Sequence, residues 1–100
     1  MPAKGKSAEE RLTERDEYIP KSVRTGTPIF VDHARGHKIV DVDGKEYIDF
    51  TGGIGVLNTG HLPDAVTDAV RAQLDKYLHI CFMVVNYEPY IELSKRLRPT

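Results

Sequence analysis

The chain of 100 residues contains one cysteine, no tryptophan, almost no net charge and no long apolar run. A single cysteine, Cys81, cannot form an internal disulfide, which excludes a small secreted domain held together by disulfides. The formal net charge of −1 gives no electrostatic attraction to nucleic acid or to an anionic membrane. The longest apolar run, residues 80–85, is far below the ~18 residues that span a bilayer. We therefore expect neither nucleic acid nor a membrane as a partner.

We also expect no secretory signal, because no apolar stretch follows Lys4 and Lys6. Together with the lone cysteine, this favours a cytoplasmic protein. What the chain does have is the composition of a folded globular protein, with 40% hydrophobic and 29% charged residues. A chain of this length forms at most one small domain, so the apolar surface that it can bury by itself is limited.

Residues 1–27 predict a helix followed by an extended arm. Ser7 and Glu10 have the spacing of a capping box, which places the start of a helix at Ser7, and Pro20 sets its end. The helix has few apolar residues, so it is marginally stable alone and gains most by lying on another surface. Glycine and proline near the end of residues 21–28 favour an extended arm there.

From residue 28 onwards apolar and polar residues alternate, and turn residues divide the pattern into three strands. Asp43-Gly44 between two alternating runs is a strong hairpin signal. The sequence predicts an antiparallel meander with strands at 29–33, 37–42 and 45–50, and a core face formed by Val40, Val42, Ile48 and Phe50. The carboxylates of this region are expected to be solvated at edges and turns, and not to form a catalytic pair: Asp41, Asp43, Glu46 and Asp49.

Two amphipathic helices follow, so the predicted fold class is α+β. Apolar residues recur at three- and four-residue spacing over 66–78, after Pro63, and form one apolar stripe. Residues 80–85 predict a strand or a buried loop. Asn86 is expected to cap the last helix, in which Glu92 and Arg96 have the spacing of an ion pair.

The glycine-rich loop between the last strand and the first of these helices is the most unusual part of the sequence. Four glycines fall within nine residues: Gly52, Gly53, Gly55 and Gly60. The loop is not a Walker A motif, because His61 and Leu62 replace the required Lys and Ser/Thr, and Asn58 breaks the dinucleotide fingerprint. Glycine permits positive φ and close approach to the backbone, so the loop could contact a ligand or another subunit. A bulged connection without any ligand is equally compatible with the residues alone.

The histidines and the cysteine predict no metal site. His33 and His37 lie on a strand–turn–strand pattern, where a spacing of four does not put both on one face. His79 and Cys81 supply only two ligands. His61 is expected to hydrogen-bond nearby backbone, and Cys81 to be a buried apolar residue. The aromatic residues near the C-terminus are more typical of a core than of a cofactor pocket: Tyr77, Phe82, Tyr87 and Tyr90.

Five segments in order resemble the opening part of the class III pyridoxal-phosphate aminotransferases, most closely the 4-aminobutyrate aminotransferases among them. The resemblance runs without gaps over about residues 16–98. It is carried by the hairpin Val40–Phe50, the loop Gly52–His61, the helical segment Ala69–Leu74, and the segments His79–Val84 and Tyr87–Leu93.

The resemblance implies a homodimeric enzyme of fold type I, an α/β fold, with pyridoxal 5'-phosphate bound to a lysine as a Schiff base. Such enzymes move an amino group from an ω-amino acid, for example 4-aminobutyrate, to the 2-oxo acid 2-oxoglutarate. Residues 28–100 then correspond to an incomplete segment of the small domain, leading into a large domain that the chain does not contain.

The resemblance also implies two substrate-binding residues. Ile54 matches the apolar residue that flanks the substrate in 4-aminobutyrate aminotransferases, whereas ornithine aminotransferases usually have a tyrosine there. Met83 stands where the bacterial 4-aminobutyrate enzymes often have glutamine, so it departs from that pattern. The four glycines around Ile54 make up the loop that carries this substrate wall.

No catalytic residue is predicted within the chain. The Schiff-base lysine and the phosphate-binding and ring-binding residues of the family correspond to positions after Thr100. None of the seven lysines lies in the apolar surroundings that lower the pKa of an amine. We therefore expect the N-terminal part of an aminotransferase, inactive as these 100 residues alone. The alternative is a free-standing interaction module derived from this fold without catalysis.

Overall fold

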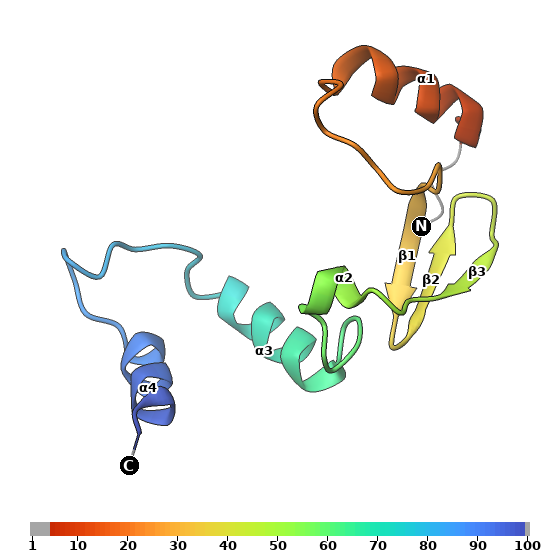
Figure 1. Cartoon of the computed structure of the whole chain (residues 1–100). Coiled ribbons are helices and arrows are strands. Elements are labelled where there is room, and N and C mark those ends of the chain that lie inside the picture. Colours follow the sequence, from red (N-terminus) through yellow and green to blue (C-terminus); the bar gives the residue numbers. More distant parts are fainter. Residues whose placement is uncertain (1–4, 100) are drawn as a thin grey trace. The chain divides into compact units, whose positions relative to one another are not determined.

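The structure is a computed structural model that describes residues 5–99. The chain divides into two compact units, one up to Thr67 and one from Asp68 onwards, and each is described by itself. Along the chain the elements are α1 (Ala8–Tyr18), β1 (Val31–Arg35), β2 (Lys38–Asp41), β3 (Glu46–Ile48), α2 (Gly52–Gly55), α3 (Asp64–Leu74) and α4 (Glu88–Leu97) (Figure 1). The boundary between the units falls inside α3.

Helix α1 begins and ends where the sequence predicts. The Ser7 Oγ accepts a hydrogen bond of 3.1 Å from the Glu10 N–H, which satisfies one of the unpaired amides at the helix start. Ile19 leaves the helix with an extended backbone, and its N–H donates to the Arg15 carbonyl at 2.8 Å. Pro20 follows and cannot continue the helix. The predicted capping of α1 is confirmed.

The three strands form one antiparallel sheet in the order β1-β2-β3, as predicted. His33 pairs with Val40 across β1 and β2, and Lys38 pairs with Ile48 across β2 and β3. Strands β2 and β3 are shorter than the predicted ranges, whereas β1 has the predicted length but lies two residues later in the chain. A register shift interrupts the pairing of β1 with β2 between Val31 and His33. The second turn contains Gly44 at a φ of 85°, the left-handed conformation that glycine adopts without cost.

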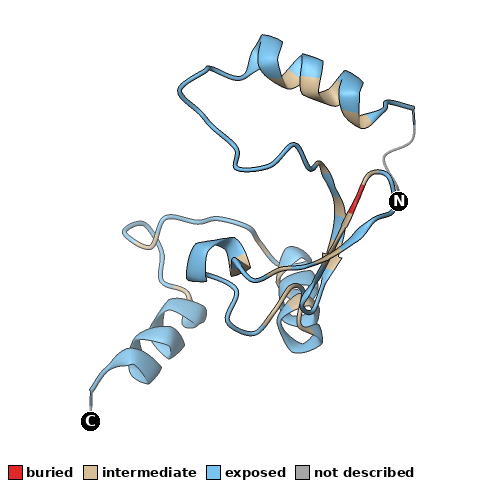
Figure 2. Ribbon diagram, turned by 45° about the vertical axis from the view of Figure 1, so that its right-hand side comes forward, coloured by how far each residue is buried: buried red, intermediate tan, exposed pale blue. Residues whose placement is uncertain are grey.

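The predicted apolar core face of the sheet is wrong. Among the described residues no hydrophobic side chain is buried (Figure 2). Phe50 and Ile48 are 92% and 60% exposed. Val40 and Val42 are half-buried. Three short strands cannot enclose a core by themselves, because the apolar face of a sheet needs a second layer against it. The alternation of apolar and polar residues correctly predicts the strands, but it does not predict whether their apolar side chains are buried.

Asp41 is the single buried residue among those described, and its expected solvation is wrong. Its carboxylate accepts hydrogen bonds of 2.9 Å from the Asp43 and Lys45 N–H groups, and a third of 2.9 Å from the Tyr47 hydroxyl. The Lys45 N–H in particular holds the pKa of Asp41 below its usual value. The hydrogen bond from the Tyr47 hydroxyl to Asp41 raises the pKa of Tyr47. A carboxylate inside the turn therefore fixes the second hairpin.

Residues 68–99 contain the end of α3, a loop and α4, with a small aromatic cluster. The rings of Phe82 and Tyr90 are stacked with their centroids 4.6 Å apart, and Tyr87 meets Phe82 edge-on at 5.1 Å. Tyr77 and Tyr87 are 6.1 Å apart. The rings contact one another, but none of them is buried and Tyr90 is 54% exposed, so the expectation that they form a core is wrong.

The loop before α4 differs from the prediction. Residues 80–85 form no strand and are not buried, and Cys81 is exposed. A loop that has no second layer over it cannot bury its apolar side chains. None of the helices in residues 5–99 has both the length and the apolar character to cross a bilayer.

The start and the ion pair of α4 also differ. The N-cap of α4 is Tyr87, one residue after the predicted Asn86, and no side chain bonds there. The helix starts instead with a proline in its first turn, where the missing N–H costs nothing. Glu92 pairs with Lys95 at 2.8 Å, and not with Arg96, because residues three apart are also neighbours on a helix.

Candidate functional site

The glycine-rich loop folds into one turn of left-handed helix. The φ angles of its four residues are 53°, 66°, 62° and 73° for Gly52, Gly53, Ile54 and Gly55. The Gly55 N–H donates to the Thr51 carbonyl at 3.0 Å, and the next two N–H groups donate to the Gly52 carbonyl at 2.9 and 2.8 Å. A left-handed turn costs L-residues roughly 1–2 kcal/mol each, whereas glycine adopts it freely. This conformation explains three of the four glycines.

Ile54 is the one residue of this turn that is not glycine. Its φ of 62° and ψ of 61° are strained for a β-branched side chain. The side chain is 92% exposed, so no packing within the chain compensates for this strain. A strained residue with an exposed side chain is typical of a site where the side chain is used.

Asp49 holds the start of the turn, and its expected solvation is wrong. One carboxylate oxygen accepts from the Thr51 hydroxyl at 2.8 Å and from the Thr51 and Gly52 N–H groups at 3.0 Å each. The other oxygen lies 2.7 Å from Nε2 of His61, and only 6% of the Asp49 side chain is exposed. The Thr51 hydroxyl, the His61 ring and the Gly52 N–H lower the pKa of Asp49 from 3.8 to about 2.

His61 joins the end of the loop to the sheet. The prediction that its ring bonds nearby backbone is wrong, since the ring contacts the Asp49 carboxylate. The backbone of His61 does pair with Gly36 in the first hairpin turn, with N–H···O distances of 2.8 and 3.0 Å. A Cβ on Gly60 would lie 3.0 Å from the Gly36 carbonyl oxygen, so Gly60 permits this close approach.

A cavity of about 340 Å³ lies beside these contacts. Its lining includes Asp49, His61, Gly52 and Gly60, together with His37. The structure thus brings the glycine-rich loop and the Asp49–His61 pair together in one place. Met83 belongs to the other unit, where its side chain is 96% exposed in the loop before α4.

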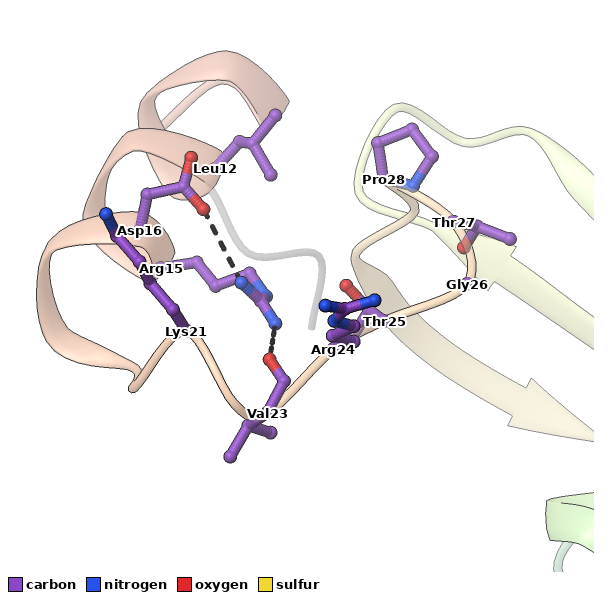
Figure 3. Close-up of a pocket in the computed structure, with 10 residues that line it drawn as sticks. All are labelled: Leu12, Arg15, Asp16, Lys21, Val23, Arg24, Thr25, Gly26, Thr27 and Pro28. Atoms are coloured by element: carbon purple, nitrogen blue, oxygen red, sulfur yellow. Dashed lines mark hydrogen bonds and ion pairs between the residues drawn. The ribbon is translucent and has the colours of Figure 1, made fainter.

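A larger cavity of about 480 Å³ lies between α1 and the extended arm (Figure 3). Arg15 holds this arrangement, because its guanidinium contacts the Asp16 carboxylate at 3.4 Å and the Val23 carbonyl at 2.5 Å. Lys21 and Arg24 also line it. No predicted site residue lies there.

The described residues do not fit the Schiff-base position of a pyridoxal phosphate site. Every described lysine is exposed. Lys38 and Lys95 pair with glutamates at 3.3 and 2.8 Å, and Lys45 lies 5.2 Å from the ring centre of Tyr47. An imine-forming lysine needs apolar surroundings that lower its pKa. In residues 5–99 no three His, Cys, Asp or Glu side chains converge as metal ligands.

Residues 18–100 match the family model of the class III aminotransferases. The chain belongs to this family. It is 52% identical over 89 residues to a 4-aminobutyrate aminotransferase of Escherichia coli. This match covers 89% of this chain and 21% of that protein. It is 48% identical over 92 residues to a 5-aminovalerate aminotransferase of Pseudomonas putida, covering 92% and 22%. The chain therefore spans about a fifth of the length of these curated relatives.

Solved structures of class III aminotransferases contain the same arrangement of elements. The acetylornithine aminotransferase of Elizabethkingia anophelis matches 93% of this chain and 25% of its own, with a TM-score of 0.81 at 21% identity. The taurine:2-oxoglutarate aminotransferase of Bifidobacterium kashiwanohense, in complex with pyridoxal phosphate and glutamate, matches 94% of this chain and 21% of its own. Its TM-score is 0.77 at 28% identity. The fold is that of part of a pyridoxal-phosphate aminotransferase.

The Asp49–His61 pair was not predicted as part of the site. One signal for it is present in the sequence, since an aspartate shortly before Thr51 and Gly52 is typical of a side chain that accepts from backbone two and three residues later. No local signal connects Asp49 with His61, which is twelve residues away.

Proposed function

We propose that this chain is the N-terminal part of a pyridoxal-phosphate-dependent aminotransferase that moves an amino group from an ω-amino acid, such as 4-aminobutyrate, to 2-oxoglutarate. The observation that carries the proposal is 52% identity over 89 residues to a 4-aminobutyrate aminotransferase. The relative that acts on 5-aminovalerate points to the same class of donor, a terminal amine on a methylene chain. A taurine:2-oxoglutarate aminotransferase among the structural neighbours supports the acceptor.

In this proposal the left-handed turn forms part of the substrate side of the active site. Ile54 projects from the turn, and an aliphatic side chain suits a methylene chain while offering no hydrogen bond to a further polar group. Met83 contributes a second flexible apolar contact. Gly52, Gly53, Gly55 and Gly60 shape the loop. The cofactor, when bound in the whole enzyme, serves as an electron sink for the amino-group transfer.

The proposed organisation assigns residues 1–27 to an N-terminal helix and arm and 28–100 to a segment of the small domain. We propose a cytoplasmic homodimer for the whole enzyme. The exposed apolar side chains on α3 and α4 agree with surfaces that the rest of such an enzyme covers. Because no described lysine suits a Schiff base, the 100 residues alone are proposed to be inactive.

The test is a chimaera in which residues 1–100 replace the matching segment of the E. coli 4-aminobutyrate aminotransferase. We expect a chimaera that binds pyridoxal phosphate and transaminates 4-aminobutyrate with 2-oxoglutarate faster than it transaminates ornithine. The isolated 100 residues with added cofactor serve as the inactive control. A chimaera with full cofactor occupancy that does not convert 4-aminobutyrate would contradict the proposed donor.

A further inference from the structure

The carboxylate of Asp49 contacts both ends of the glycine-rich loop. At the start of the loop it accepts three hydrogen bonds of 2.8–3.0 Å from Thr51 and Gly52, directly before the left-handed turn. At the end it lies 2.7 Å from Nε2 of His61. His61 is in turn paired with Gly36 through two backbone hydrogen bonds. The Asp49 side chain therefore connects the residues before the turn that carries Ile54 with a residue after it.

The turn has few other contacts that hold its shape. Gly53, Ile54, Gly55 and Val56 are all exposed. The left-handed conformation of Ile54 is intrinsically unfavourable, so the conformation persists only if its surroundings determine it. Apart from the backbone hydrogen bonds inside the turn, Asp49 supplies the interactions that fix where the turn starts. Burial of its side chain to 6% exposure limits its freedom to move.

We infer that Asp49 is a positioning residue for the substrate side of the active site: its carboxylate sets the direction in which the left-handed turn presents Ile54. This inference rests on the proposed function, in which Ile54 contacts the methylene chain of the donor. Asp49 itself does not touch the substrate. His61 completes the arrangement by holding the second carboxylate oxygen and attaching the loop to the first hairpin turn.

The inference gives a specific expectation for kinetics of the chimaera. Asp49→Ala removes the acceptor for Thr51 and Gly52, so Ile54 loses its fixed direction. We expect kcat/KM for 4-aminobutyrate to fall about tenfold, mainly through KM, because misplacing one apolar wall costs about as much as losing a methylene contact. Cofactor occupancy is expected to stay unchanged. Asp49→Asn retains one carbonyl oxygen for the same two N–H groups, so it is expected to restore most of the activity.

The decisive measurement is a double-mutant cycle between Asp49 and Ile54. If Asp49 acts through Ile54, then Asp49→Ala changes kcat/KM little once Ile54→Gly has removed the wall, and the two effects are not additive. His61→Gln, a milder change that leaves the Thr51 and Gly52 contacts in place, is expected to give the same non-additivity at smaller size. Glu46→Gln serves as the control, since Glu46 is an exposed carboxylate on β3, the strand that precedes Asp49.

The outcomes separate the inference from the proposed function. Additive effects of Asp49→Ala and Ile54→Gly, or of His61→Gln and Ile54→Gly if the first variant does not fold, overturn the positioning role and leave the proposed function intact. An Ile54→Gly chimaera with unchanged kcat/KM removes Ile54 from the substrate site and overturns the positioning role, whereas its turnover of 4-aminobutyrate still supports the proposed function. Loss of activity in Glu46→Gln equal to that in Asp49→Ala also overturns the inference, because it indicates a general effect of charge.

Discussion

At the scale of single residues, two carboxylates that the sequence places in hairpin edges and turns, Asp41 and Asp49, are largely enclosed in the first unit. Asp41 accepts three hydrogen bonds inside the second hairpin turn, and Asp49 accepts four at the glycine-rich loop. Sequence patterns identify such residues as turn formers, but they do not identify which backbone amides a carboxylate will meet. The chemistry of the site depends on those amides.

The hydrogen bonds of Asp49 make one contribution to stability dependent on pH. Its pKa in the folded chain is about 2, below the ordinary value of 3.8, so the folded state favours the charged form. The stabilisation is therefore fully present above about pH 4 and is lost as the pH falls from about 4 through 2. A carbon-13 titration of the Asp49 carboxyl should give a midpoint near 2, and a midpoint at the ordinary value would mean that the contacts do not form.

The strain at Ile54 could not have been predicted from the residue type. Isoleucine favours extended backbone, and a sequence-based reading of the loop gives only a tight connection with glycines. The glycines on both sides of Ile54 impose a left-handed turn, and Ile54 follows its neighbours. The neighbours decide the conformation, because four successive residues share one hydrogen-bonded turn.

At the scale of elements, the parts that depend on local interactions were predictable. The Ser7 cap, the proline after α1 and the Asp43-Gly44 turn each act within a few residues, and each lies where the sequence predicts. The predicted N-cap of α4, Asn86, is one residue too early. Two features that favour a helix start lie close together there, an asparagine cap and a proline in the first turn. Contacts across longer separations, such as that between Gly36 and His61, leave no local pattern.

The attachment of the glycine-rich loop to the first hairpin can be tested by comparing two glycines. Gly60 and Gly55 both have positive φ, 85° and 73°, but only at Gly60 would a Cβ meet backbone, at 3.0 Å from the Gly36 oxygen. Gly60→Ala must therefore disturb the hydrogen bonds between Gly36 and His61, in addition to the strain common to both variants. We expect Gly60→Ala to be less stable than Gly55→Ala by about 1–2 kcal/mol.

Amide hydrogen exchange in the chimaera tests whether the loss of stability in Gly60→Ala arises at the hydrogen bonds between Gly36 and His61. The Gly36 and His61 amides should exchange faster in Gly60→Ala than in Gly55→Ala, because each of them donates across the bridge. Equal exchange in the two variants would show that the bridge does not depend on close approach at Gly60.

At the scale of the whole molecule, the described residues 5–99 form amphipathic elements without a buried apolar core. The predicted stripe over 66–78 is only partly on a helix, since α3 ends at Leu74 and Tyr77 and Leu78 lie after it. Val70 on α3 is 54% exposed and Leu97 on α4 is 73% exposed. Periodicity predicts which side chains share a face, and it contains no information on what covers that face. The curated relatives are about five times longer than the segment matched here, so most of their contacts lie outside it.

The exposed stripes predict self-association of the isolated 100 residues. Several large apolar side chains on one helix face favour association, and there is little buried apolar area to stabilise a monomer. Sedimentation velocity should show concentration-dependent species larger than a monomer, with a broad thermal transition. Leu93→Lys in the apolar stripe of α4 should reduce association, whereas Asp68→Lys on the polar face of α3 should not. A monomer that unfolds cooperatively would contradict this expectation.

The left-handed turn has a consequence for the chirality of the residues that fit it. A backbone with four positive φ angles in succession is locally the mirror image of an ordinary helical turn, and mirror-image amino acids prefer that hand. A chemically synthesised chain with D-alanine at position 55 should therefore retain the turn, while L-alanine strains it. The same substitution would restrict the unfolded chain more than glycine does, and so favour the folded turn. In this segment the D-residue is the conservative replacement.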